Sequence, residues 1–257
     1  MGFRAHDGRD PVRLSQQAMQ PQLPRRFYRE VTVSAGEDGW FSVLLDGRQA
    51  RTPARRPLRA PTRALAGTIA AEWAAQEKEI NPASMPATRM AVAAIDAVEP
   101  DPEAALQEII RYAGSDLLCY RAGGPESLAL RQTQLWDPVL AWMDERYGAR
   151  FALAEGVMFV QQPQAALAAA EAAVRAHAHP FAIAGLHVMT SLAGSVLLAL
   201  AVREGRLGVA EAWAAAHVDE DHQIALWGED AEAAQRRARR FTDFRAAADA
   251  CRAGMAG

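Results

Sequence analysis

The sequence of 257 residues is half hydrophobic and carries a net charge of -3, so it can bury the core of one large domain or two modest ones. This slightly acidic balance argues against a nucleic-acid-binding protein, which usually presents a strongly basic face. The two cysteines, Cys119 and Cys251, lie far apart and match no metal-binding or redox spacing, as expected of thiols in a reducing compartment.

The first 24 residues contain three arginines but no apolar segment, so they do not resemble a secretory signal. Asp7 and Asp10 also argue against a mitochondrial transit peptide, because such peptides are poor in acidic residues. We therefore expect residues 1–24 to form a flexible arm on a cytoplasmic protein of bacterial type.

An antiparallel sheet is predicted after residue 25. Alternating hydrophobic residues indicate strands over 27–33 and 40–45, and Asp46-Gly47 is a strong signal for a hairpin turn into a third strand over 48–52. Prolines follow, and with them come arginines that indicate either a solvated loop or a docking edge for an acidic partner: Arg51, Arg55, Arg56, Arg59 and Arg63.

Helical periodicity begins at Thr62, a suitable N-cap residue, and continues to Gln76. Two proline-containing breaks precede a second helix over 87–98. Pro100-Asp101-Pro102 then predicts a boundary between a small α+β domain over 25–100 and a helical domain over 101–257.

The second part of the chain is predicted to be mostly helical. Helices are expected over 103–112, 127–147 and 163–178, with a break or kink at Pro138, and residues 151–160 are expected to form an extended crossover. The basic run 236–240 in the last helix indicates a solvated helix face rather than a nucleic-acid-binding patch.

The most apolar run covers residues 181–202 and contains no formal charge. Its length would suffice for a membrane span. Glycine, serine, threonine and histidine interrupt the run, however, and no second span accompanies it. We therefore interpret it as the central helix of a bundle, buried on all sides.

The most unusual stretch runs from residue 216 to residue 230 and concentrates acidic and aromatic residues. Wound as one helix with the residues before it, it would place Trp213, His217, Glu220, Ile224 and Trp227 on one buried stripe. An unpaired carboxylate is costly to bury. Glu220 is therefore expected to be paired internally, to line a cleft or to await a partner protein.

A metal-dependent enzyme is the alternative interpretation of this stretch. His217 and Asp221 are four residues apart and could share a metal ion, with Glu220 beside them, whereas His222 lies about 140° round the helix from His217. The sequence contains no glycine-rich phosphate loop, nucleophile elbow or His-Glu-x-x-His motif.

Phrases distributed over residues 25–245 make the chain resemble the ATP-twelve family of assembly chaperones. Those proteins escort the α subunit of the catalytic head of F-type ATP synthase. The phrases are Arg25-Arg26-Phe27-Tyr28, Leu44-Leu45-Asp46-Gly47-Arg48 with Thr52-Pro53, Ala71-Glu72-Trp73-Ala74-Ala75-Gln76, Met85-Pro86-Ala87-Thr88-Arg89, Asp116-Leu117-Leu118-Cys119-Tyr120-Arg121, Trp136-Asp137-Pro138 and the stretch from His217 to Asp230.

The resemblance implies an α+β fold, in which a small N-terminal β-containing domain precedes a C-terminal all-α orthogonal helical bundle. It implies no catalysis and no cofactor, and a chaperone that binds the free α subunit and covers the surface that the β subunit later occupies. An acidic residue of the C-terminal helices matters in the family, and it matches Glu220 here, with Asp221 as second choice. We expect a monomer without membrane insertion, whose partner-binding residues are Glu220, Asp221, Ile224, Trp227, Glu229 and Asp230.

Overall fold

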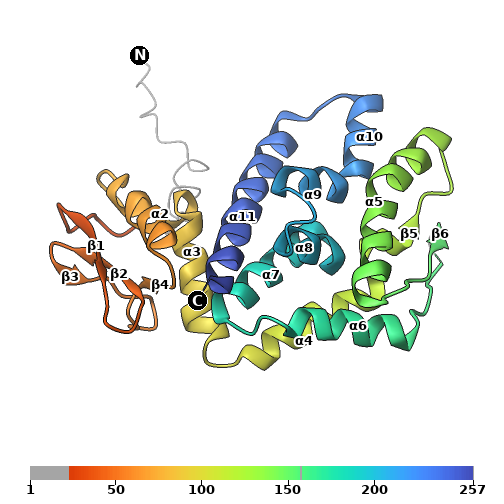
Figure 1. Cartoon of the computed structure of the whole chain (residues 1–257). Helices are drawn as coiled ribbons and strands as arrows, with labels where there is room; N and C mark the ends of the chain where they lie inside the picture. Colours follow the sequence, from red (N-terminus) through yellow and green to blue (C-terminus); the bar gives the residue numbers. More distant parts are fainter. Residues whose placement is uncertain (1–22, 157, 257) are drawn as a thin grey trace, which may run out of the picture.

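The computed structural model describes residues 23–156 and 158–256, so almost all of the predicted N-terminal arm lies outside the described residues. A small antiparallel sheet near the N-terminus is followed by helices that make up most of the chain (Figure 1). The predicted α+β class is confirmed.

The sheet is organised around a central strand to which three others pair in antiparallel fashion. Asp46 and Gly47 form the predicted hairpin turn, because both adopt the positive φ angles that such turns require, 49° and 75°. The strands are shorter than predicted, since the first begins only at Val31. The four strands are β1 (Val31–Ala35), β2 (Phe41–Leu45) at the centre, β3 (Arg48–Gln49) and β4 (Arg59–Ala60).

The helices follow the predicted order. Thr62 caps the first of them as expected, since its hydroxyl accepts the N–H of Leu65 at 3.3 Å, and α5 continues across Pro138. The helices are α2 (Arg63–Ala74), α3 (Pro86–Val92) with a π-helical turn (Ala93–Val98), α4 (Pro102–Tyr112), α5 (Glu126–Tyr147), α6 (Gln164–Arg175), α7 (Pro180–Ala193), α8 (Val196–Arg203), α9 (Val209–Ala216), α10 (Val218–Trp227) and α11 (Ala231–Met255).

The extended crossover predicted over 151–160 is mostly irregular. Within its described residues only Ala154–Glu155 forms a strand, β6, which pairs in parallel with β5 (Tyr120–Arg121). This short pair joins the segment after α5 to the segment before it.

The most apolar run is not one central helix, and that prediction is wrong. Gly194, with φ at 67°, ends α7 in the left-handed conformation, and the hydroxyl of Ser195 starts α8 by accepting the N–H of Leu198 at 3.0 Å. The buried carboxylate of Asp116 holds this break by accepting from the Ser195 hydroxyl at 2.7 Å and from the N–H of Leu197 at 3.1 Å. In the described part of the chain, no helix has the length and apolar character needed to cross a membrane.

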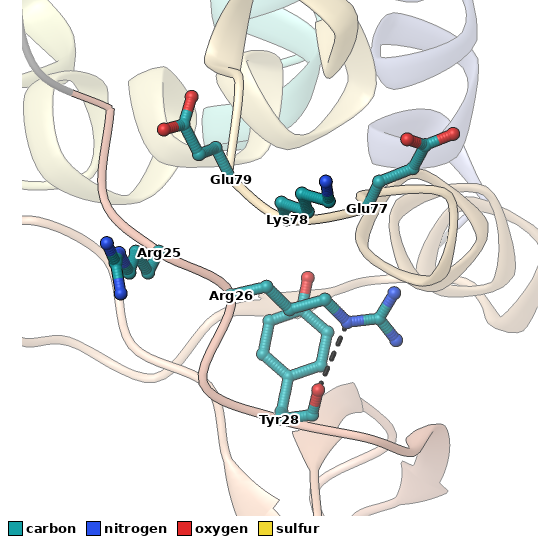
Figure 2. A pocket seen from close by; sticks show the side chains of 6 residues that line it. All are labelled: Arg25, Arg26, Tyr28, Glu77, Lys78 and Glu79. Carbon is teal, nitrogen blue, oxygen red and sulfur yellow. Dashed lines mark hydrogen bonds between the residues drawn. The ribbon is translucent and has the colours of Figure 1, made fainter.

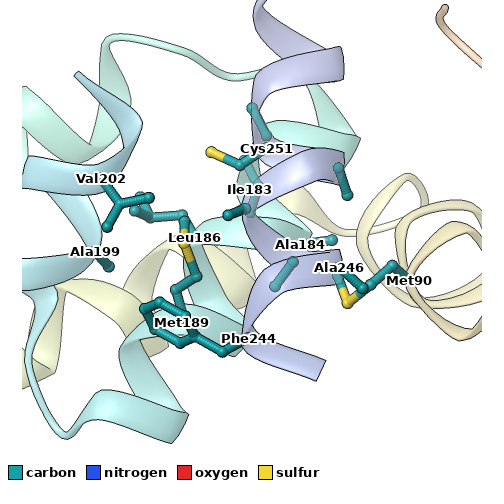
Figure 3. Packing of buried hydrophobic residues seen from close by; sticks show 14 of the residues in the cluster. Met90, Ile183, Ala184, Leu186, Met189, Ala199, Val202, Phe244, Ala246 and Cys251 are labelled. Carbon is teal, nitrogen blue, oxygen red and sulfur yellow. The ribbon is translucent and has the colours of Figure 1, made fainter. Parts of the chain in front are cut away.

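The core is centred on the crossing of α7 and α11 (Figure 3). Leu186 and Met189 of α7 and Phe244 of α11 are buried there, beside side chains of α8 and α3. Gly185 allows the two helices to touch, because a Cβ atom at this position would lie 2.3 Å from the carbonyl oxygen of Ala247. Since α3 and the turn after it also pack on α7, buried side chains run from the sheet into the bundle, and the division near residue 100 stays a prediction.

Candidate partner-binding surface

The joint between α9 and α10 is made by a single residue. His217 leaves the helical conformation, with φ and ψ angles of -118° and 20°, so α9 ends at Ala216 and α10 begins at Val218. Its imidazole packs on Trp213 at 3.9 Å between ring centroids, and Nδ1–H donates to the Trp213 carbonyl oxygen at 2.8 Å. Burial lowers the pKa of His217, which favours the neutral ring at pH 7.

This break changes which side chains share a face, and the predicted stripe is wrong. Trp213 is buried on α9 against Phe241 and Phe244, whereas Trp227, at the end of α10, is 82% exposed. Hydrophobicity alone predicted burial for both tryptophans. The kink at His217 separates them, because residues on either side of it no longer follow one helical period.

The inner face of α10 is fixed to the bundle by buried and polar contacts. Val218 and His222 are buried, and the carboxylate of Asp219 accepts from Nε2 of Gln132 on α5 at 2.7 Å. Asp221 forms an ion pair with Arg237 of α11 at 2.5 Å, with both side chains less than one-third exposed. The Asp221 carboxylate is thus engaged inside the protein.

The outer face of α10 carries the remaining acidic and apolar side chains. The side chain of Glu220 is 42% exposed, and its carboxylate lies 4.0 Å from Nε2 of the neutral His217 ring. Ile224 is half-buried and Leu226 is 60% exposed beside Trp227. The structure therefore separates two neighbouring acids, of which one faces inward and one outward.

The turn after α10 adds a second exposed acid. Gly228, with φ at 88°, ends the helix, and Glu229 is exposed. Asp230 is also exposed, but one of its carboxylate oxygens caps α11 by accepting the N–H of Ala233 at 2.7 Å. We define the α10 surface as the outward-facing set Glu220, Ile224, Leu226, Trp227 and Glu229.

Leu226 is the member of this surface that sequence reasoning missed. Two adjacent large apolar residues, Leu226 and Trp227, stand directly before a helix-ending glycine. Adjacent apolar residues in a helix can both be buried, as Leu197 and Leu198 of α8 are. The sequence therefore carried no clear signal for the exposure of Leu226.

The metal-site alternative lacks the required geometry. Nδ1 of His217 is bound to a backbone carbonyl oxygen, and Asp221 is paired with Arg237. Over residues 23–156 and 158–256, no three histidine, cysteine, aspartate or glutamate side chains come together as a possible ligand set. His217 and Glu220 thus lie close together, with Nε2 and the carboxylate 4.0 Å apart, but no third ligand joins them among the described residues.

The fold and the α10 surface define the class of this molecule: an α+β protein that presents an acidic and aromatic helix face on a firmly packed helical scaffold. A family model described as ATP12 chaperone protein matches residues 25–144. The crystal structure of the Atu1473 protein from Agrobacterium tumefaciens matches with a TM-score of 0.85 and 51% identity, over 95% of this chain and 91% of that one.

Atp12 from Paracoccus denitrificans matches with a TM-score of 0.81 and 38% identity, over 90% of this chain and 98% of that one. A variant of the Paracoccus protein, in which an aspartate is replaced by lysine, matches with the same values. This chain belongs to the ATP12 chaperone family, and its role is that of a chaperone.

Proposed function

We propose that this chaperone binds the unassembled α subunit of the F-type ATP synthase catalytic head and covers the surface that the β subunit later contacts. It then hands the α subunit on to the α/β ring. The role requires no reaction and no cofactor, and we place it in the bacterial cytoplasm with the protein acting as a monomer. Family membership and the α10 surface support this proposal.

The observation that carries the proposal is the exposure of Leu226 and Trp227 on a helix that is fixed from behind. Large side chains that are exposed in the free protein contribute strongly when a partner covers them, and tryptophan is frequent among such contacts. Gln132 and Arg237 hold the inner face of α10. Binding therefore costs little conformational entropy, because the helix is already ordered in the free protein.

The outward acids give the surface its selectivity. Glu220 and Glu229 place negative charge on either side of the apolar pair, which suits a client surface with exposed arginine or lysine next to apolar groups. Asp221 and Asp230 have structural partners, so in this proposal they shape α10 and the turn after it. Glu220 takes the role of the acidic residue that contacts the client.

Transient binding follows from the mixed character of the surface. An unassembled α subunit exposes apolar area that is prone to aggregate until the β subunit covers it. A small interface with charges at its rim covers such area with modest affinity, and modest affinity keeps dissociation fast. The β subunit can then displace the chaperone by offering a larger interface.

The test compares binding of purified α subunit to immobilised wild-type chaperone and to the double variant Leu226→Ser/Trp227→Ala. The expected result is a dissociation constant raised at least tenfold with an unchanged thermal midpoint, because both side chains are exposed. Leu153→Ser is the matched control, since Leu153 is 51% exposed, precedes β6 and is not part of the α10 surface. Equal binding by the double variant and the wild type would overturn the role of the α10 surface.

A further inference from the structure

A second surface feature lies on the opposite side of the molecule from α10, where the sheet meets α2 (Figure 1). It is a cavity of about 570 Å³, within the size range of ordinary ligand sites. Three segments far apart in sequence build its wall, and the residues are Phe27, Tyr28, Leu45, Asp46, Arg48, Gln49, Ala50, Arg51 and Trp73. We call it the aromatic–arginine pocket.

The backbone before Phe27 is pinned in place. Arg26 N–H donates to the Lys78 carbonyl oxygen at 3.0 Å, and the guanidinium of Arg26 donates to the carbonyl oxygens of Tyr28 at 3.1 Å and Ala74 at 3.3 Å. Figure 2 shows Arg26 reaching beside the Tyr28 ring at a neighbouring cavity, opposite the segment that carries Lys78. The segment that presents Phe27 is therefore fixed.

Phe27 itself projects into solvent at the edge of the pocket. Tyr28 is buried, with its hydroxyl donating to the Trp73 carbonyl oxygen at 2.7 Å, and the Phe27 ring stands edge-on to it at 5.3 Å. Phe27 nevertheless remains 72% exposed. A phenylalanine on a fixed segment, exposed and beside a cavity, is suited to pack against an incoming apolar side chain.

The charge of the pocket is positive. Arg48 and Arg51 both line it, and within the described residues neither guanidinium lies within 4.0 Å of a carboxylate oxygen. The carboxyl-bearing residue of the wall, Asp46, is already engaged by the N–H groups of Arg29 at 3.0 Å and Glu30 at 2.8 Å, and these hydrogen bonds lower its pKa.

The arginines that indicated a docking edge differ in their contacts. Arg56 and Arg59 pair with Glu99, and Arg59 also pairs with Asp38, so both are used inside the protein. Arg51 turns toward the pocket instead, with one guanidinium nitrogen held by the Arg55 carbonyl oxygen at 2.7 Å. Of these three arginines, Arg51 is therefore the one that remains a candidate for docking an acidic partner, and it does so at the pocket.

Trp73 contributes its indole ring to the same wall. Its indole Nε1 is buried and has no acceptor among the described residues, so this atom is not a contact for a ligand in the pocket. The groups that the wall offers to a ligand are the two guanidinium groups and the exposed phenylalanine. They suit a ligand that carries both carboxylate oxygens and an apolar side chain.

We propose that the aromatic–arginine pocket binds a short acidic segment of a partner protein, in which an aromatic or aliphatic side chain stands next to a carboxylate. The carboxylates pair with Arg48 and Arg51, and the apolar side chain packs on Phe27. This site is separate from the α10 surface, and its chemistry is the reverse, since it attracts negative rather than positive charge. The proposal for this pocket does not depend on whether the α subunit is the client of the α10 surface.

The experiment titrates ¹⁵N-labelled protein with the acetylated and amidated peptide Asp-Phe-Glu-Leu and follows the indole N–H resonance of Trp73. That resonance is assigned by its loss in Trp73→Phe. We expect a saturable shift with the acidic peptide, and at least tenfold weaker binding of the neutral peptide Asn-Phe-Gln-Leu. Arg48→Gln and Arg51→Gln should each weaken binding, whereas Arg55→Gln, on the same loop but outside the pocket wall, should bind as the wild type does.

Three outcomes would overturn the proposal. The first is a Trp73 resonance that does not move with millimolar acidic peptide. The second is equal affinity for the neutral peptide, which would remove the role of the arginines. The third is a shift of the same size with inorganic phosphate alone, which would identify a simple anion site rather than a peptide site.

Discussion

Two substitutions of the same type should change the stability of this protein in opposite directions. Gly185 lies at the crossing of α7 and α11, whereas Gly67 lies on the exposed face of α2. Alanine favours a helix by about 1 kcal/mol over glycine at an open position. Any difference between Gly185→Ala and Gly67→Ala therefore measures the packing at the crossing.

The magnitude follows from the contacts that the new methyl group would make. At Gly185 the Cβ atom would lie 2.3 Å from the Ala247 carbonyl oxygen and 2.7 Å from the Cys251 nitrogen, and backbone atoms cannot move without separating the helices. Overpacking of this kind costs roughly 1–3 kcal/mol, of which the helix preference returns up to about 1 kcal/mol. At Gly67 no atom of the described residues lies within 4 Å of the added Cβ atom, so a gain of about 0.5–1 kcal/mol is expected.

The assay is thermal unfolding followed by circular dichroism. For a chain of this size, 1 kcal/mol shifts the midpoint by about 2–4 °C, so Gly185→Ala should lower it by several degrees and Gly67→Ala should raise it by about 1–4 °C. Client binding should be unchanged in both variants, because neither glycine lies on the α10 surface. A midpoint for Gly185→Ala at or above the wild-type value would refute the close crossing.

Further predictions concern the buried and half-buried acids. Burial raises the pKa of Asp116 from 3.8 to about 6, so the folded protein binds this proton more tightly than the unfolded chain does, and about 3 kcal/mol of stability is lost as pH rises from 4 through 6. The urea midpoint of Asp116→Asn should lack this decline with pH. Parallel midpoint curves for the variant and the wild type would contradict the assignment to Asp116. Arg237→Gln should cost about 1 kcal/mol and speed tryptic cleavage near α10, since it leaves Asp221 without its partner. Glu220→Gln should leave the unfolding free energy within about 0.5 kcal/mol of wild type but weaken client binding several-fold, and a large loss of stability would indicate an internal role.

Features governed by neighbours in sequence could be predicted from the sequence. Asp46-Gly47 specifies its hairpin turn and Thr62 specifies the start of α2, because the chemistry of each signal acts within a few residues. The breaks in the helices could not be predicted in this way. Ser195 starts α8 with the help of Asp116, which is remote in the sequence and reaches it only in the folded chain.

The same distinction applies to the candidate site. The stretch that carries the α10 surface stood out in sequence by its composition, but the sequence did not separate the inward Asp221 from the outward Glu220. That separation depends on Arg237 of α11 and on the joint at His217. The exposure of Trp227 could not be predicted either, because a single helical period was continued across that joint.

The most direct test of the chaperone account is co-expression of the cognate ATP synthase α subunit with this protein, in the absence of the β subunit. The account predicts that soluble α subunit increases and that the two proteins elute together as a complex. Addition of β subunit should then release the chaperone. If the α subunit aggregates equally with and without this protein, while controls that contain the β subunit assemble normally, the assignment of the α subunit as client is contradicted.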